Sequence, residues 1–447
     1  MTTGPTSGGR RSRTGTPPGD APRRTSPAPH GRRPREKAAG GESLVGSEWT
    51  VEVGPIAHGG HCVARHEGQV LFVRHALPGE TVVARVTEGR VGDRFVRADA
   101  VSVLSASPER VTPPCPYAAP GLCGGCDFQH VSLPYQRQLK ASVVREQFSR
   151  LAGLDVDPAV RAVPGDTDGL RWRTRVEFAV DQDGRAGLRA HRSRAIIPVD
   201  DCLIATHGVI DSGVLDTEWT GVESVDVVDA AHPEEPVLVP VPGPEGSDGS
   251  GGLVGELVTD GDWSGEYVVA ARGFWQVHPG AASTFLSRVT ALLGAEPGDR
   301  VLDLYAGSGL FTVRLGELVA PGGFVLGVEG DARAVDNGTR NTEHLDNVEW
   351  RANRVDREVR SLVDQQITAD LVVLDPPRTG AGKDVMALVA ALGPRRVVYV
   401  ACDPAALARD VRAASEHGYR LASLEAWDAF PMTHHVESIA VLEPASE

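Results

Sequence analysis

A lone cysteine, Cys402, stands where a run of β-forming residues gives way to a helical pattern, in the stretch VYVACDPAALARD. Strands and helices alternate around it, and in such folds ligands bind at the carboxyl ends of the strands. Packing in a core is the commonest use of a free cysteine. Because the turn of Asp403 and Pro404 follows at once, we expect Cys402 at the ligand-binding edge, where a thiol can act as a nucleophile.

A thiol at such an edge suits the methylation of carbon 5 of a pyrimidine. This carbon is a weak nucleophile, but addition of a thiolate at C6 generates an enolate that takes a methyl group from a sulfonium. A base must then remove the C5 proton so that the thiolate can leave. Glu437, at the start of the last predicted strand in AFPMTHHVESIAVLE, is the candidate base; the alternative is a solvated carboxylate at a strand end.

The stretch VLDLYAGSGLF has the pattern of a turn that brings backbone amides close to a ligand. Asp303 ends a predicted strand, and the small residues 306–309 follow it. A purely structural glycine turn is the more frequent origin of this pattern alone. Glu329, 26 residues after Asp303, ends the next predicted strand and suits ribose hydroxyls. Since Thr312 stands where a dinucleotide site has its third glycine, the pattern favours a nucleoside without phosphates, S-adenosylmethionine (SAM).

A second motif, LVVLDPPRTG, places Asp375 at a strand end, in a turn restricted by two prolines. Enzymes that methylate the amino groups of bases typically have an aromatic residue after the two prolines. This chain has Arg378 at that position, which argues against an amino-group methyltransferase.

Four other cysteines have the pattern of a metal site. Cys115, Cys123 and Cys126 form C-x7-C-x2-C, and Cys202 follows in the segment DDCLIA. Tetrahedral zinc and an iron-sulfur cluster are both compatible with four thiolates, and spacing does not choose between them. Cys62, inside a predicted barrel, is expected to pack.

The elements that position these residues fall into three predicted domains. Residues 273–447 alternate strands with helical patterns, which predicts an α/β Rossmann-like, doubly wound sheet with strands at 301–304, 324–329, 371–375 and 397–401. Residues 45–106 indicate five short strands punctuated by Gly and Pro, typical of an OB-like β-barrel. Residues 107–272 are predicted to form a central β-rich α+β domain that carries the four cysteines and a helix over 133–151.

Two stretches of the central domain carry further expectations. In LRWRTRVEFAV, alternation places Arg171, Arg173 and Arg175 on one strand face, which favours contact with RNA phosphates; a solvated sheet face is the alternative. Residues 230–262 are rich in Pro, Gly and Ser and hold seven acidic residues without Lys or Arg. We therefore expect a flexible surface insertion there, not a site.

The composition is that of a globular chain with an uneven charge. The 447 residues carry a net charge of −15, yet residues 1–40 hold nine Lys and Arg against Asp20 and Glu36. We expect residues 1–44 to be a disordered basic tail, either an RNA-contacting arm or a solubilising extension. No apolar stretch suits a secretory signal or a membrane span, so a monomeric, cytoplasmic protein with no membrane partner is expected.

From about Glu48 onward, the motifs taken together resemble those of one family. The matching stretches, in the family's order, are ALPGE, CGGCDFQH, RWRTRVEF, FWQVHPGA, DLYAGSGLFT, DPPRTG, ACDPAALARD and HHVES. The chain is similar to the class I SAM-dependent RNA (uracil-5-)methyltransferases that carry an N-terminal TRAM domain and an iron-sulfur cluster. The resemblance implies a TRAM barrel at 45–106, a methyltransferase domain at 273–447, and methylation of a uridine at C5 in structured RNA, with ribosomal RNA preferred over transfer RNA.

The resemblance also implies roles for individual residues. Cys402 is the expected nucleophile and Glu437 the expected base. The residues expected to hold SAM or orient the uracil are Gln276, Tyr305, Glu329 and Asp375, with Asp303 and Gly307 lining the same pocket. The ligands expected for a [4Fe-4S] cluster of structural or RNA-positioning role are Cys115, Cys123, Cys126 and Cys202.

One departure from the family pattern and two alternative functions follow from the same residues. The family usually has Ser-Cys-Asn-Pro where this chain has Ala-Cys-Asp-Pro, and the carboxylate of Asp403 is expected to raise the pKa of the thiol. A cytosine-5 RNA methyltransferase uses the same thiol chemistry, but usually from a Pro-Cys motif on another strand. A non-catalytic RNA-binding iron-sulfur protein would have no need of Cys402, Glu437 and Asp375.

Overall fold

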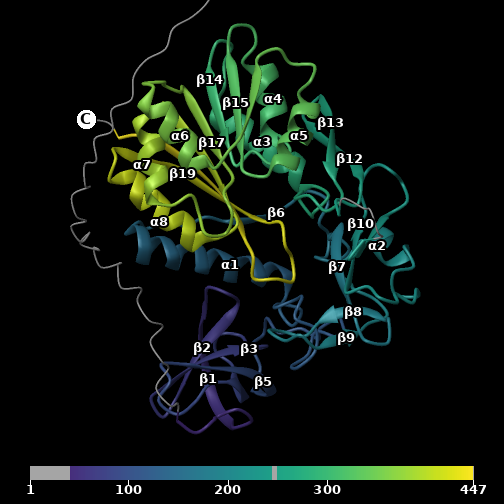
Figure 1. Cartoon of the computed structure of the whole chain (residues 1–447). Coiled ribbons are helices and arrows are strands. Elements are labelled where there is room, and N and C mark those ends of the chain that lie inside the picture. Colours follow the sequence, from purple (N-terminus) through teal and green to yellow (C-terminus); the bar gives the residue numbers. More distant parts are fainter. Residues whose placement is uncertain (1–40, 244–248, 446–447) are drawn as a thin grey trace, which may run out of the picture. The chain divides into compact units, whose positions relative to one another are not determined.

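The C-terminal half of the chain is built on one eight-stranded sheet (Figure 1). The computed structural model describes residues 41–243 and 249–445, so the expected basic tail lies, up to residue 40, outside the described part. The strands, in their order across the sheet, are β16 (Val348–Ala352), β15 (Phe324–Glu329), β14 (Arg300–Leu304), β17 (Leu371–Leu374), β18 (Arg396–Ala401), β20 (Glu437–Pro444), β19 (Tyr419–Asp428) and β6 (Val160–Ala162). Strands β14 to β18 are parallel, whereas β20 is antiparallel to both β18 and β19.

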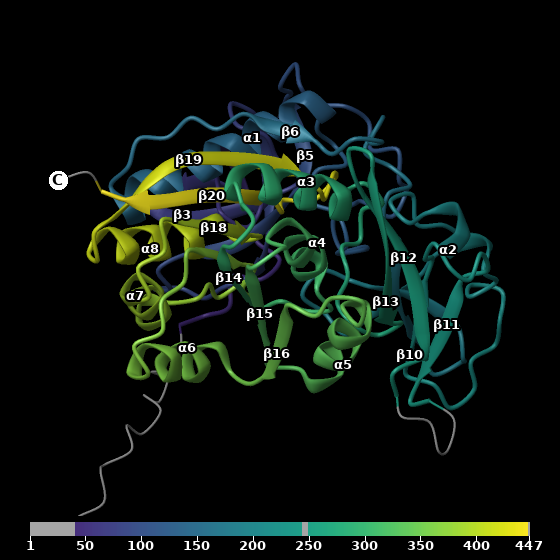
Figure 2. The same ribbon diagram turned by 90° about the horizontal axis from the view of Figure 1, so that it is seen from above.

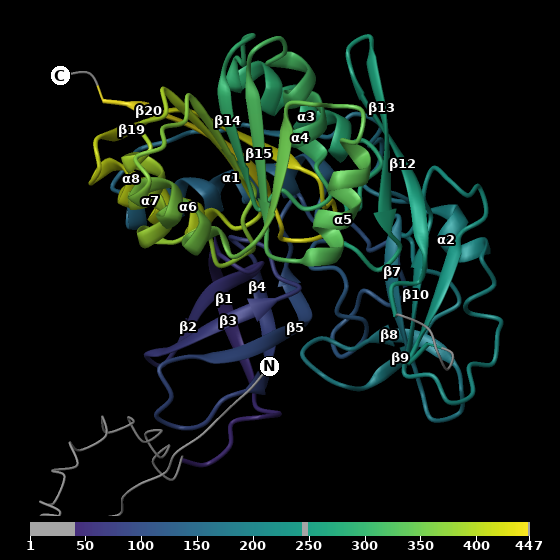
Figure 3. The ribbon, with the colours of Figure 1, turned by 45° about the horizontal axis from the view of Figure 1, so that its top comes forward.

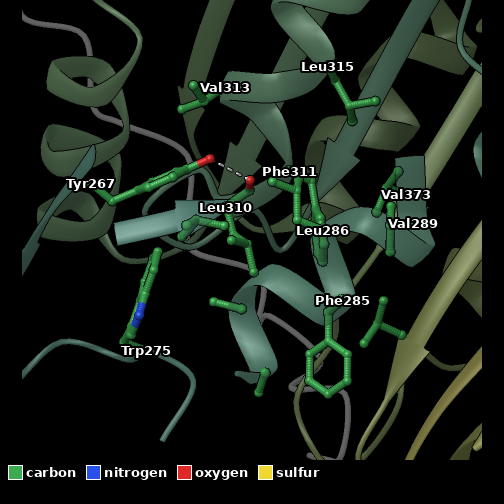
Figure 4. Packing of buried hydrophobic residues seen from close by; sticks show 14 of the residues in the cluster. Tyr267, Trp275, Phe285, Leu286, Val289, Leu310, Phe311, Val313, Leu315 and Val373 are labelled. Carbon is green, nitrogen blue, oxygen red and sulfur yellow. Dashed lines mark hydrogen bonds between the residues drawn. The ribbon is translucent and has the colours of Figure 1, made fainter. Parts of the chain in front are cut away.

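Helices cover both faces of this sheet, as a doubly wound fold requires (Figure 2). The helices of one face are α3 (Ala281–Leu293), α4 (Leu310–Leu318) and α5 (Ala332–Asn341), and those of the other are α6 (Val355–Asp364), α7 (Lys383–Ala391) and α8 (Pro404–Ser415). The parallel strands are apolar on both faces, because each face is buried under helices. In Figure 4, Phe285 and Leu286 of α3 pack with Phe311 of α4, and the hydroxyl of Tyr267 donates a hydrogen bond to the Leu310 carbonyl (3.0 Å).

The N-terminal region contains a closed five-stranded barrel, as expected (Figure 3). Its strands are β1 (Glu48–Ala57), β2 (His61–His66), β3 (Gln69–Arg74), β4 (Thr81–Glu88) and β5 (Val96–Ser105). Small β-branched and aliphatic residues alternate into its interior, and Cys62 packs there with its thiol against the Ala76 carbonyl (3.3 Å). Glu80, fully buried after the ALPG turn, receives two hydrogen bonds from Arg110 (2.6 and 2.7 Å). This ion pair ties the barrel to the chain that leaves it.

The central region combines a second sheet, a hairpin and a helix. The sheet has the order β11 (Val237–Val241), β10 (Ser224–Val228), β7 (Arg175–Val180), β8 (Ala186–Arg189) and β9 (Ile196–Pro198). The hairpin consists of β12 (Leu253–Asp260) and β13 (Trp263–Ala270). The expected helix forms α1 (Leu133–Gln147), extended by a π-helical turn at Phe148–Ala152, and a short α2 (His207–Asp211) follows β9.

The stretch 230–262 differs from its expectation as a flexible loop. It contains β11 and β12, which pair with β10 and β13 respectively, and only residues 244–248 within it lie outside the described part. The apolar runs VLVPV and LVGELV form these strands, and the average over a Pro-rich and acidic window concealed them. Among the helices of the described residues, none is long and apolar enough to cross a membrane.

Candidate active site

A cavity of about 1170 Å³ lies at the carboxyl ends of the parallel strands. This is the edge where doubly wound folds bind their ligands. The expected site residues that line it are Gln276, Tyr305, Gly307, Glu329, Asp375, Cys402 and Glu437. Residues from the ends of four parallel strands, from the start of β20 and from the segment after β13 thus meet in one place.

The loop after β14 and the end of β15 form the cofactor side of the cavity. The backbone amide of Gly307 donates to the Glu329 carboxylate (3.0 Å), and the amide of Asp331 donates to its other oxygen (2.8 Å). Gly309 has φ +92°, and a Cβ there would lie 3.1 Å from the Trp350 ring, so the tight turn requires glycine. Glu329 is therefore fixed in orientation, with its carboxylate in the cavity wall.

Asp303 does not line the cavity, and its expected position there is wrong. Its side chain is fully buried beneath the loop and accepts a hydrogen bond from the Thr312 hydroxyl (2.6 Å). Burial raises the pKa of Asp303 to about 7, and the neighbouring Glu329 adds to this rise. A position at a strand end does not reveal the direction of the side chain. The Asp303 side chain points toward the start of α4, and its hydrogen bond with Thr312 joins this helix to β14.

The candidate nucleophile and base flank the same end of one strand ladder. The antiparallel ladder of β18 and β20 ends with Ala401 paired with Ser438; Cys402 directly follows Ala401, and Glu437 directly precedes Ser438. Burial raises the pKa of Cys402 to about 12, with Glu437 and Asp375 as the next causes. Burial and then Asp375 raise the pKa of Glu437 well above its usual value. In the free protein both shifts favour the protonated forms.

Arg378 is the cation that favours the deprotonated forms of both groups. Its charge lowers the pKa of Cys402 and that of Glu437, against the effect of burial. It also lies 3.5 Å from the ring of His435, whose pKa is lowered to about 3, mainly by burial. Arg378, His435 and the exposed ring of Phe274 all line the cavity. Sequence reasoning assigned none of them a role there, although each lies within one of the quoted motifs.

Asp403, the departure from the family pattern, has a compensating partner. It caps α8 by accepting a hydrogen bond from the Ala406 amide (2.7 Å), and it pairs with His58 from the turn between β1 and β2 (3.0 Å). These contacts hold the pKa of Asp403 below its usual value despite its partial burial. The carboxylate raises the pKa of Cys402, as expected, but less than burial, Glu437 or Asp375 does.

The segment that leads into Glu437 is held by helix α1. Lys140 is fully buried and donates to the Asp428 carboxylate (2.5 Å) and to the Phe430 carbonyl (3.0 Å). The side chain of Gln136 accepts a hydrogen bond from the Met432 amide (2.9 Å). Met432 has φ +63°, a conformation that costs free energy in a side-chain-bearing residue and persists because these contacts hold it.

The cysteine loop holds the same segment from another side. The amides of Asp127 and Phe128 donate to the Met432 carbonyl (2.9 Å each), and the Asp127 carboxylate lies 2.6 Å from the ring of His434. Asp127 follows Cys126 directly, so the loop of the cysteines and the strand of the base are joined by a few hydrogen bonds.

The four expected metal ligands surround one cavity. Cys115, Cys123, Cys126 and Cys202 line a space of about 430 Å³. The Gly125 amide donates to the Cys123 sulfur and the Gln129 side chain to the Cys126 sulfur (3.4 Å each), as donors around thiolate-held clusters do. No group of three or more His, Cys, Asp or Glu in the described part of the chain is spaced to hold a single metal ion.

The three arginines of LRWRTRVEF do not share a strand face. Strand β7 begins only at Arg175, which pairs with Glu256 (2.6 Å), and Arg171 forms a two-pronged pair with Asp201 (2.6 and 2.8 Å). Arg171 also has φ +55°, which breaks the alternation. The expected phosphate-binding face is therefore wrong for two of the three, and only Arg173 opens onto the cavity.

The fold and the site define the class of a SAM-dependent methyltransferase. The tRNA (uracil-54, C5)-methyltransferase of Pyrococcus abyssi, solved in complex with S-adenosyl-L-homocysteine, has the same fold: the TM-score is 0.63 at 23% identity, over 88% of this chain and 99% of that one.

Comparison of sequences gives the family. Residues 261–445 match the model of the tRNA (uracil-5-)-methyltransferase family, and residues 42–101 match that of the TRAM domain. An uncharacterized RNA methyltransferase of Streptomyces coelicolor is 47% identical over 91% of this chain and 94% of its own length. The 23S rRNA (uracil(1939)-C(5))-methyltransferase RlmD of Alkalilimnicola ehrlichii is 33% identical over 87% and 95%. The chain belongs to the tRNA (uracil-5-)-methyltransferase family, and the expected family and TRAM domain are confirmed.

Proposed function

We propose that the protein transfers a methyl group from SAM to C5 of a uridine in structured RNA, through a covalent bond between the Cys402 sulfur and C6. The observation that carries this proposal is that Cys402 and Glu437, which flank the last pair of the β18–β20 ladder, line the cavity that also contains Glu329, Gln276 and Asp375. Alkylation at C5 requires a thiol, an acid-base group and residues that bind the cofactor. A protein that only binds RNA would not require this combination.

Each step has a residue in place. The target uridine turns out of its stack into the cavity, because C5 and C6 are inaccessible within a helix. Cys402, as thiolate, adds to C6, and the charge moves to the ring oxygen at C4. Bound SAM would supply the methyl group from its sulfonium, and C5 would accept it. Glu437, as carboxylate, then takes the C5 proton, and the C6–sulfur bond breaks to release the product.

The remaining residues would bind and orient. Glu329, with both oxygens fixed by backbone amides, suits the ribose hydroxyls of SAM, and Tyr305 and Gly307 stand beside it in the loop. Asp375 and Gln276 would hold the cofactor or the uracil between them. Burial and the charges of Asp303 and Glu329 raise the pKa of Asp375 to about 7, so at neutral pH it can also donate a hydrogen bond.

We assign a [4Fe-4S] cluster to the site formed by Cys115, Cys123, Cys126 and Cys202. Methyl transfer needs no electron, so its role would be structural or would concern the placement of RNA. Iron analysis and a visible spectrum of anaerobically purified protein test this assignment. Stoichiometric zinc without iron would refute it.

We propose that the protein is a cytoplasmic monomer and that its substrate is ribosomal RNA. The RlmD relative supports the choice of ribosomal RNA because this chain aligns with nearly the whole length of that protein. The test incubates the protein with total RNA and methyl-labelled SAM, separates ribosomal from transfer RNA, and identifies the labelled nucleoside. We expect 5-methyluridine in ribosomal RNA. 5-Methylcytidine, or no labelled nucleoside in any RNA, would reject the proposed function.

The mechanism is tested with two cysteine variants. Cys402→Ala should abolish transfer and prevent covalent trapping on RNA that contains 5-fluorouridine. Cys62→Ala, which removes a thiol packed inside the barrel, is the matched control and should retain both. Trapping by Cys402→Ala would show that another group attacks C6.

A further inference from the structure

Arg173 lines two cavities at once. It forms part of the wall of the catalytic cavity and part of the wall of the cavity with the four cysteines. No other described residue is common to the linings of these two cavities. Besides the hydrogen bonds of Asp127 and Phe128 to Met432, this side chain is therefore a direct connection between the cysteine site and the catalytic site.

The charge of Arg173 has no carboxylate partner among the described residues, unlike that of Arg171 or Arg175. Its Nε donates to the Arg175 carbonyl (3.0 Å), which leaves both terminal nitrogens free of hydrogen bonds within the described part of the chain. Burial lowers its pKa, and the cysteines Cys202 and Cys126 act in the opposite direction. A buried cation without an anion is costly in free energy. We therefore expect this guanidinium to face negative charge both in the cavity of the cysteines and in the catalytic cavity.

The backbone of Arg173 is fastened to the segment of Cys202. Its amide donates to the Ile204 carbonyl (2.7 Å), and its own carbonyl accepts from the Thr206 amide (3.0 Å). A shift of Cys202 would therefore shift Arg173 as well.

Arg173 lines the same cavity as Cys402 and Glu437, and its charge is not among those that act on Glu437. A guanidinium in the cavity wall with two free terminal nitrogens suits the anionic part of a nucleotide, the backbone phosphate. Two free terminal nitrogens match two phosphate oxygens.

We propose that Arg173 binds the backbone phosphate of the target uridine with both terminal nitrogens, and that the cysteine site holds it in that position. The inference rests on the proposed function and adds a positioning residue to it. It also gives the cysteine site a purpose without electron transfer: the thiolates keep an arginine aimed at RNA.

The test compares two RNA fragments that contain the uridine located by the labelling experiment. One has a normal phosphate 5′ to that uridine and the other an uncharged methylphosphonate. Dissociation constants are measured at one salt concentration, with S-adenosyl-L-homocysteine present to prevent turnover. For the unaltered protein, loss of the charge should weaken binding about 10- to 100-fold. Arg173→Gln should bind both fragments alike, at the weaker level.

Arg272→Gln is the matched control. Arg272 lines the same cavity, but its charge is already paired with Asp226 (2.7 Å), so this variant should still distinguish the two fragments. If Arg173→Gln distinguishes them as well as the unaltered protein does, Arg173 does not bind this phosphate.

The role of the cysteine site is tested in the same assay. Cys202→Ser should lose most of the discrimination between the fragments, and Cys202→Ser combined with Arg173→Gln should bind no more weakly than Arg173→Gln alone. Cys115→Ser, at a half-buried ligand, replaces Cys202→Ser if the latter does not fold. Full discrimination by the cysteine variant, or effects that multiply in the double variant, would refute the coupling.

The proposed function fails, and this inference with it, if the unaltered protein methylates no RNA. If it does methylate RNA, these results bear on Arg173 alone.

Discussion

Cys402 and Glu437 share a buried cavity with Asp375, and three negative charges at such close quarters are unfavourable. The free protein therefore keeps its thiol protonated, although the reaction needs a thiolate. A protonated thiol is also protected from oxidation, because the thiolate is the reactive form. Activation must then accompany the arrival of RNA and of the positively charged sulfonium.

The role of Glu437 predicts a stalled reaction in Glu437→Gln. Without the carboxylate, the C5 proton stays in place and the sulfur cannot leave, so the protein should remain covalently bound to methylated RNA. A denaturing gel with labelled RNA should show this complex, and turnover should fall about 10²- to 10⁴-fold. Rapid turnover without a complex would assign the base to another residue.

The role of Arg378 predicts a shift in the pH dependence. Its positive charge lowers the pKa of both Cys402 and Glu437, so its removal raises both, and the active deprotonated forms need a higher pH. In both proteins kcat/KM should rise with pH. In Arg378→Gln the rise should be displaced upward, with a loss of about 10-fold at pH 7.5 for a shift of one pKa unit.

Arg378→Lys, which keeps the charge, should recover part of this loss. An equal loss by Arg378→Lys and Arg378→Gln would show that the residue acts by contact and not through its charge.

At this scale, the sequence allowed prediction of the residues whose position at a strand end fixes their neighbourhood, such as Cys402, Glu329 and Asp375. It did not allow prediction of Asp303, because the direction of a side chain depends on the packing around it. Nor did it separate Arg173 from Arg171 and Arg175. The acids that pair with the latter two, Asp201 and Glu256, lie 30 and 81 residues away along the chain.

Among the elements, helix α1 is the support of the strand that carries the base. Its Lys140, with no exposed surface, is bonded to Asp428 and Phe430 at one end of the segment that reaches Glu437. The helix thus contributes to catalysis although none of its residues lines the catalytic cavity.

Lys140→Met should therefore lower stability and activity together. It leaves the buried Asp428 without its closest partner, at a cost of about 3 kcal/mol in the free energy of unfolding. Urea denaturation followed by circular dichroism should show a lower midpoint. Arg145→Gln, on the same helix, breaks an exposed pair with Asp157 and should cost less than about 1 kcal/mol. Equal effects of the two variants would contradict a special role of Lys140.

Four of the five parallel strands could be predicted nearly to the residue, because they are buried apolar runs; β16 was not predicted, since as an edge strand it is only partly buried. The expected strand at 301–304 forms as Arg300–Leu304, and that at 397–401 as Arg396–Ala401. The joining of β6 to β19 could not be foreseen, since it pairs residues more than 250 positions apart. The strands in 230–262 were missed because composition was averaged over the whole stretch.

In the whole molecule, the barrel contacts the residue next to the nucleophile. His58, in a turn of the barrel, pairs with Asp403, which caps the helix after Cys402. The TRAM domain is thereby joined to the proposed catalytic site. Motif order was enough to predict the family and both domains, but no motif records a contact between His58 and Asp403.

His58→Ala should slow methyl transfer without weakening the binding of SAM. The charge of Asp403 would lose its partner and disfavour the thiolate of Cys402 more strongly. We expect kcat to fall about 2- to 5-fold. Arg85→Gln, which breaks an exposed pair with Glu48 elsewhere on the barrel, is the control. A loss of SAM affinity in calorimetry, or an equal loss of kcat in the control, would point to general disturbance of the fold.

The ladder between β18 and β20 has a consequence for how this protein can evolve. Because Cys402 and Glu437 adjoin the last pair of this ladder, Ala401 with Ser438, their separation depends on the register of the two strands. A single extra residue in either strand would turn one of the two side chains to the opposite face of the sheet. Homologous enzymes should therefore tolerate length variation almost anywhere except in these two strands, and deep mutational scanning with single-codon duplications would find them the least permissive part of the chain.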